Sequence, residues 1–191
     1  MTLFFKKKKQ LSPKLNQTVL DRIKEESNRK GIEQVLSIQL LYQKNGIGEV
    51  QVSFSNRLPS DLGFVRFEGK KNEEILAHGE FQYESGNIFF YPNVEIEWKL
   101  TPKKNIHKIQ SNYQFSKSKL VFDKTDLNQL QPILSECFVK EGVISVFMDQ
   151  NICQLELDEL DIEKESRISD VLLTYFSSLY LSPLKESRHH L

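Results

Sequence analysis

The sequence predicts an α+β protein of two small domains, each with a mixed or antiparallel sheet packed against one or two helices. Hydrophobic residues make up 39% of the 191 residues, which is enough apolar material for one large core or two small ones. Apolar residues recur at helical spacing in three segments and alternate at a period of two in several others. A polar stretch with a proline, 101–105, lies between the two sets of segments and predicts a domain boundary near 101–110.

The first predicted element is an amphipathic helix near the N-terminus. Ser12 and Pro13 are the residue types preferred at an N-cap and at the first helical position. Gly31 is a glycine C-cap. Between them, four apolar residues recur at helical spacing: Leu15, Val19, Leu20 and Ile23. The four lysines within residues 1–10 are expected to form a solvated basic tail.

A β-hairpin is expected next, because the period of the apolar residues falls to two from Val35. Asn45-Gly46 is a turn signal, and alternation resumes over Val50–Phe54. Short strands and a tight turn at Ser85-Gly86-Asn87 follow. The strands are expected near 63–68, 80–84, 88–91 and 94–100. These elements form the first predicted domain, residues 11–105.

The second half is expected to contain a strand over 119–123 and a helix over 127–139 that ends at Gly142. A second hairpin is expected over 143–157, because Asp149-Gln150-Asn151 permits positive φ between two apolar runs. A last helix covers 168–179. The second predicted domain therefore spans residues 111–183, and 184–191 is a tail.

Charge and composition narrow the expected partners and compartment. Lys plus Arg equals Asp plus Glu at 26 each, so nucleic acid is not an expected partner. No apolar run approaches the roughly 20 residues of a membrane helix, and so no integral membrane segment is expected. Residues 1–5 precede the lysines, which is the wrong order for a signal peptide. With only two cysteines, the expected location is the cytoplasm.

The local patterns that accompany catalysis are missing from the sequence. Asn45-Gly46-Ile47-Gly48 joins two expected strands instead of opening a helix, so it is not a phosphate loop. The four histidines form no His-x-x-x-His pair, and the two cysteines form no Cys-x-x-Cys. We therefore expect a protein that is not an enzyme and that holds no metal or cofactor.

Two alternatives remain open. Cys137 and Cys153 fit the apolar periodicity of their segments and are expected to be small buried side chains. Because a cluster normally takes four thiolates, these cysteines could hold an iron–sulfur cluster or a metal only across a homodimer. The strand aromatics are expected to be core, but they could instead line the ligand groove of a small-molecule-binding regulatory domain. They are Phe81, Tyr83, Phe89, Phe90, Tyr91 and Trp98.

The second half resembles the N-terminal domain of Nfu-type iron–sulfur scaffold proteins over residues 111–183. The likeness lies in the segments 113–123, 134–148 and 151–155, and its most specific piece is Glu141–Phe147, EGVISVF. In that family a strand precedes a helix ending in this motif, and a short turn, a strand and a closing helix follow. The family's Pro-Asn-Pro element is replaced here by Gln114-Phe115-Ser116.

The first half is similar, more faintly, to the A-type carrier domain of HesB and IscA proteins. Leu11-Ser-Pro-Lys opens the expected helix, Gly31 closes it, and a strand runs into the glycine turn Lys44–Glu49. The family's metal-site cysteines have no counterpart, because residues 1–136 contain no cysteine. The resemblance therefore implies a degenerate A-type domain. Such domains also occur in Nfu-type proteins, where they are thought to direct the carrier to its clients.

Together the two resemblances imply a role in iron–sulfur cluster assembly by contact. The Nfu domain that holds the cluster carries a Cys-x-x-Cys, which this chain lacks. The two resemblances imply a non-catalytic accessory or targeting protein that binds an iron–sulfur carrier or an apo-protein client and holds no cluster itself. Sheet edges and exposed apolar patches are the expected contacts. The candidate interaction residues are Gly142, Val143, Phe147 and Asn151, and the sequence leaves the oligomeric state open.

Overall fold

The computed structural model describes residues 13–43, 46–61, 63–68, 78–180 and 185–186. Their content is mixed α and β, which confirms the predicted fold class. In chain order the elements are β1 (Lys14–Leu15), α1 (Gln17–Lys30), β2 (Gln34–Gln43), β3 (Gly46–Asn56), β4 (Val65–Phe67), β5 (Gly79–Glu84), β6 (Asn87–Pro92), β7 (Ile96–Lys99), β8 (Ile106–Ser111), β9 (Ser116–Asp123), the 3₁₀ turn η1 (Leu127–Gln129), α3 (Pro132–Lys140), β10 (Ser145–Gln150), β11 (Ile152–Glu156), α4 (Ile162–Ser178) and β12 (Lys185–Glu186).

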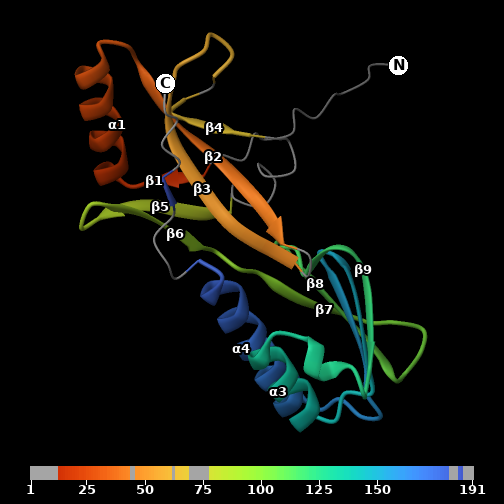
Figure 1. Cartoon of the computed structure of the whole chain (residues 1–191). Helices are drawn as coiled ribbons and strands as arrows, with labels where there is room; N and C mark the ends of the chain where they lie inside the picture. Colours follow the sequence, from red (N-terminus) through yellow and green to blue (C-terminus); the bar gives the residue numbers. More distant parts are fainter. Residues whose placement is uncertain (1–12, 44–45, 62, 69–77, 181–184, 187–191) are drawn as a thin grey trace, which may run out of the picture.

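The first half forms α1 and two small sheets, one of which also includes β12 from the predicted C-terminal tail (Figure 1). One sheet has the order β12-β3-β2-β4, and its central pair is the predicted antiparallel β2–β3 hairpin. The other sheet has the order β1-β5-β6. Val19 and Ile23 of α1 are buried with Leu36 and Ile38 of β2, because the apolar stripe of the helix faces the apolar side of the hairpin.

The start of α1 differs from the prediction, whereas its end is confirmed. Lys14 and Leu15 pair in parallel with β5 and are not helical. The helix begins after Asn16, whose side chain accepts a hydrogen bond from the Thr18 backbone N–H at 3.1 Å. The predicted cap Ser12 lies outside the described residues. Gly31 has φ of 68°, the left-handed conformation of a glycine C-cap.

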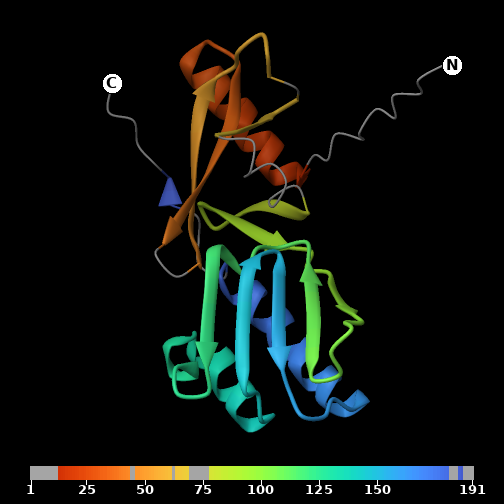
Figure 2. The ribbon, with the colours of Figure 1, turned by 90° about the vertical axis from the view of Figure 1, so that its right-hand side faces the viewer.

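The second half is a two-layer unit. Its sheet has the order β7-β8-β11-β10-β9, and all neighbouring strands are antiparallel. Figure 2 shows both helices, α3 and α4, behind this sheet, so the other face of the sheet points toward the viewer. Five inward-pointing side chains of the three central strands are buried under the helices: Ile109, Val146, Met148, Cys153 and Leu155.

The predicted linker is a turn within this sheet. Strands β7 and β8 pair antiparallel from Ile96↔Ser111 to Lys99↔Lys108. Residues 101–105 connect them, and the Thr101 hydroxyl donates hydrogen bonds to the backbone carbonyls of Lys103, within the turn, and Ile106, at the start of β8. The stretch lacks apolar periodicity because it is a hairpin turn, so it does not join two domains. The division of the chain into two independently folding domains stays a prediction.

The helix predicted over 127–139 is broken near its start. η1 and α3 are separate because Pro132 begins α3 at a position where a proline needs no hydrogen-bonded N–H. Gly142 has φ of 77° and follows the end of α3, as expected. The β10–β11 hairpin is also confirmed, with positive φ of 52° at Gln150.

The two halves share one continuous core. The Phe90 ring of β6 lies 4.7 Å from the Phe81 ring and 5.0 Å from the ring of Tyr180, which follows α4. Tyr113 lies 6.1 Å from Tyr180 and 5.9 Å from Phe176. These aromatic contacts connect the β5–β6 ribbon to the core of the five-stranded sheet. No helix within the described residues is long and apolar enough to span a membrane.

Candidate functional site

The candidate site is the face of the five-stranded sheet that α3 and α4 leave uncovered, named here the open face. Successive side chains of a strand point to opposite sides, so the residues between the buried ones belong to this face. In sheet order from β7 to β9 they are Glu97, Lys99, Ile106, Lys108, Gln110, Ile152, Gln154, Glu156, Ser145, Phe147, Asp149, Lys119, Val121 and Asp123.

One row of residues crosses the centre of the open face. The strand registers place Lys99, Lys108, Gln154, Phe147 and Val121 side by side, in that order. Phe147 is half-buried and Val121 is 71% exposed. The row therefore changes from cationic at the β7 edge to apolar at the β9 edge.

Ordered polar groups lie on one side of this row. The Glu156 carboxylate accepts hydrogen bonds from the Ser145 hydroxyl at 2.7 Å and from the Asn105 side-chain amide at 3.1 Å. The Asp123 carboxylate accepts from the Thr125 hydroxyl at 2.6 Å and from the Thr125 backbone N–H at 2.8 Å. These bonds lower the pKa of Asp123. An apolar pair with a polar border is the arrangement of many protein contact surfaces.

The structure places the four predicted interaction residues in different environments. Phe147 lies on the open face, and Asn151 is partly exposed in the β10–β11 turn. Gly142 is exposed after α3. Val143 is only 1% exposed, so its side chain is not available to a partner, which corrects that prediction. The apolar character of Val143 contributes to the core.

The most specific segment of the Nfu resemblance also has a packing role. Glu141, 7% exposed, accepts two hydrogen bonds from the Arg167 guanidinium of α4, at 2.8 and 2.9 Å. The Arg167 hydrogen bond is the main reason that the pKa of Glu141 lies below its usual value. This ion pair fixes the end of α3 to α4. A helix-end glutamate gives no sequence signal of a partner 26 residues away.

Both cysteines face the layer between helices and sheet, as expected for buried side chains. Cys137 of α3 is 8% exposed, and burial raises its thiol pKa to about 11. Cys153 of β11 is fully buried, and burial raises its pKa even further. Both thiols are thus protonated at neutral pH, whereas metal ligation needs thiolates. Within the described residues, no three His, Cys, Asp or Glu side chains form a metal-binding group.

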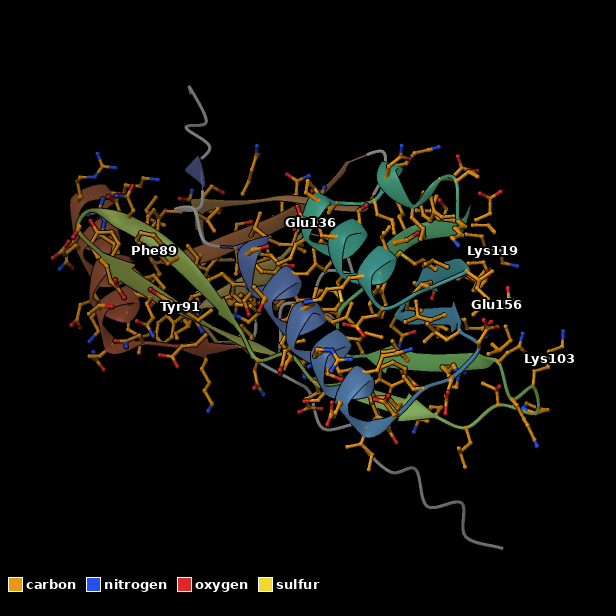
Figure 3. The ribbon with its side chains drawn as sticks, turned by 90° about the horizontal axis from the view of Figure 1, so that it is seen from below. Phe89, Tyr91, Lys103, Lys119, Glu136 and Glu156 are labelled. Carbon is orange, nitrogen blue, oxygen red and sulfur yellow. The ribbon has the colours of Figure 1, made fainter. Side chains whose placement is uncertain are left out.

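The aromatic residues are divided between core and surface. Phe81 and Phe90 are buried, as predicted, while Tyr91 is 45% exposed. Figure 3 shows Phe89 and Tyr91 along β6, at a distance from the labelled residues of the five-stranded sheet. A cavity of about 360 Å³ on the first half has a mainly polar lining and includes no aromatic side chain. Its lining residues are Ser37, Gln39, Gln51, Val52, Ser53, Ser55 and Glu68.

The chain matches no family model, and no curated protein matches it.

Proposed function

We propose that this chain is a non-catalytic accessory or targeting protein of iron–sulfur cluster assembly, which binds a carrier or an apo-protein client through the open face. The observation that carries the proposal is the contrast between an uncovered sheet face centred on Phe147 and two cysteines enclosed in the core. The chain thus has an exposed surface for contact, whereas neither of its cysteines is accessible as a thiolate.

Burial of the thiols supports contact over cluster carriage. In a homodimeric carrier, Cys137 and Cys153 from both subunits would have to reach a common surface as thiolates. Cys153 points into the core from a central strand between β8 and β10, so no surface contact reaches it without opening the helix–sheet layer. The side chains present fit poorly as cluster ligands in this conformation.

The open face has the properties of a docking surface. Phe147 is the aromatic residue on its central row and can supply the apolar anchor that binding surfaces commonly use. Lys99 and Lys108 extend the same row and favour a partner with acidic groups beside an apolar pocket. Truncation of one such anchor typically costs at least about 1–2 kcal/mol of binding energy.

The element order supports the assignment to iron–sulfur assembly. The Nfu resemblance implies a strand, a helix ending in EGVISVF, a short turn, a strand and a closing helix. The chain has one more strand than this order, because Ser145–Phe147 of the motif belong to β10 and not to α3. Its elements are β9, α3, β10, β11 and α4. The partner class rests on this resemblance, and the contact surface rests on the geometry of the sheet.

The test is anaerobic affinity capture of the tagged full chain from its own cells, with bound proteins identified by mass spectrometry and iron and sulfide assayed in the eluate. The chain should enrich iron–sulfur carriers or clients without stoichiometric iron on itself. Phe147→Asp should lose them. Tyr91→Asp changes another exposed aromatic on the first half and should retain them. Circular dichroism would establish that both variants fold.

Two results would contradict the proposal. Iron and sulfide bound to the isolated chain, and lost in Cys137→Ser or Cys153→Ser, would favour the dimeric carrier. Equal capture by Phe147→Asp and the unaltered chain would exclude the open face as the contact surface.

A further inference from the structure

The outer edge of β9 lacks a partner strand within the described residues. β9 has eight residues, and the described ladder pairs it only with β10. The strand at the opposite edge of the sheet, β7, has only four residues. An edge strand directs alternate backbone N–H and C=O groups away from the sheet, where another strand can pair with them.

The second part of β9 is complementary to itself in reverse. Residues 119–123 have the sequence Lys-Leu-Val-Phe-Asp, with a cation at one end, an anion at the other and three apolar residues between. Lys119, Val121 and Asp123 lie on the open face, whereas Leu120 and Phe122 point toward the core. An antiparallel copy therefore offers an opposite charge to each end.

We propose that a second copy of this chain pairs with the edge of β9 in antiparallel register, with Val121 opposite Val121 and Lys119 opposite Asp123. The pairing joins the two five-stranded sheets into one across a two-fold axis. Such an interface is isologous, since each copy presents the same residues to the other. Asp123 is exposed and its pKa lies below the usual value, so its charge is present at neutral pH.

The charges select this register. A shift of two residues in one direction places Lys119 opposite Val121, and a shift in the other places Asp123 opposite Val121. The first shift brings Asp123 opposite Lys117 but leaves Lys119 opposite an apolar residue, and the second leaves Asp123 opposite an apolar residue, so neither shift gives both Lys119 and Asp123 an opposite charge. A shift of one residue would place core-facing residues opposite open-face residues, which the pleat forbids. One register therefore pairs both ends of the segment.

The core side of the edge also fits an added strand. A cavity of about 120 Å³ opens beneath β9. Leu120 and Phe122 line its sheet side, and Leu130 lines its helix side. In the proposed register Leu120 lies opposite Phe122 of the second copy. The apolar side chains on the covered side of the two sheets would therefore contact each other at the two-fold axis. The half-buried state of both residues in one copy is consistent with a core that continues beyond the edge.

The dimer is independent of the proposed function. Cys153 lies on β11, which is separated from β9 by β10, so the axis does not bring the thiols of two copies together. Phe147 lies on β10, next to Val121 but inside the edge strand, and its side chain stays on the open face. A dimer can therefore form whether or not the open face binds an assembly partner.

The test is sedimentation equilibrium of the full chain over a range of concentrations. We expect a species of twice the 22.4 kDa chain mass. Val121→Asp places two carboxylates at the axis and should weaken the dimer at least tenfold; Val121 is 71% exposed, so the fold should persist. Lys119→Asp should also weaken it, and the double variant Lys119→Asp/Asp123→Lys should restore it. Lys103→Asp is the matched control and should have no effect, since Lys103 lies in the β7–β8 turn (Figure 3).

A chain that remains monomeric at every concentration overturns the proposal. A dimer that Val121→Asp leaves unchanged places the interface elsewhere and overturns it as well. Failure of the double variant to restore the dimer excludes the stated register. Phe147→Asp should leave the dissociation constant of the dimer unchanged, which separates this test from that of the proposed function.

Discussion

The two faces of the five-stranded sheet differ although the same strands form them. The covered face has at its centre fully buried residues such as Val146, Leu155 and Cys153. The open face combines lysines, carboxylates and the apolar pair Phe147 and Val121. One step along β10, from Val146 to Phe147, crosses from a core position to a surface position. The comparison separates residues that stabilise the fold from residues that are free to make contacts.

This separation predicts that substitutions on one face change folding and those on the other change binding. The clearest test uses two phenylalanines. Phe138 of α3 is fully buried, so Phe138→Ala should lower the free energy of unfolding by about 3–5 kcal/mol. Phe147→Ala should lower it by about 1 kcal/mol, because the ring is half-buried. Urea unfolding with a shared m-value gives both numbers, and equal losses would refute the distinction between the faces.

The rate at which the two cysteines are alkylated tests whether the covered face is closed to solvent. Because the pKa of Cys137 is raised to about 11, only about one thiol in a thousand is ionised at pH 8. Alkylation by iodoacetamide at pH 8 should therefore be about a hundredfold slower in the folded chain than in urea. Cys153 should react only on unfolding. Measuring each rate in the Cys137→Ser and Cys153→Ser variants assigns the sites.

Anaerobic reconstitution with iron and sulfide extends this comparison. The unaltered chain and both serine variants should all remain without the visible absorption of a cluster. Fast alkylation of either thiol in the folded chain would support the alternative of a homodimeric cluster carrier. So would a coloured product that either serine variant loses.

The next prediction concerns the ion pair between Glu141 and Arg167, which joins the end of α3 to α4 on the covered side of the sheet. The folded chain lowers the pKa of Glu141, so the ion pair stabilises the fold above the unfolded pKa of about 4.3, and the contribution is lost as the pH falls through the folded value. Arg167→Ala should lower the thermal midpoint most at pH 6–7. The difference from the unaltered chain should shrink below about pH 4.

A surface ion pair provides the control for this variant. Lys24→Ala removes a 3.8 Å contact with Asp21 between two exposed side chains, and its effect should be close to zero at every pH. A pH-independent loss in Arg167→Ala would assign the effect to packing of the arginine stem instead of its charge.

Local patterns in the sequence predict much of this fold, because they depend on neighbouring residues. Gly31 and Gly142 end helices, and the period-two segments become hairpins. Long-range pairings have no such signal. Leu15 joins Phe81 in a parallel pair, which turned the predicted first turn of α1 into β1. Likewise, the pairing of β7 with β8 converted a predicted linker into a turn.

The candidate site was predictable only in part, for the same reason. Alternation along β10 indicates that Phe147 and its neighbours point to opposite sides, but it does not say which side the helices cover. Val143 precedes β10, and its burial depends on the packing of the segment after α3. The row through Lys108 and Phe147 arises from the registers of separate strands, which the chain alone does not specify.

The smallest predicted effect compares two valines on adjoining strands. Val121→Thr should change the free energy of unfolding by no more than about 0.5 kcal/mol, because the side chain is 71% exposed. Val146→Thr places a hydroxyl at a position with no exposure and should cost about 1–3 kcal/mol. Both variants should be measured at protein concentrations well below the dissociation constant of the dimer. Pairing at β9 would bury Val121 and enlarge the effect of its substitution. A growing loss in Val121→Thr with protein concentration would itself report that pairing, whereas equal losses for the two valines would mean that the open face is covered within one chain.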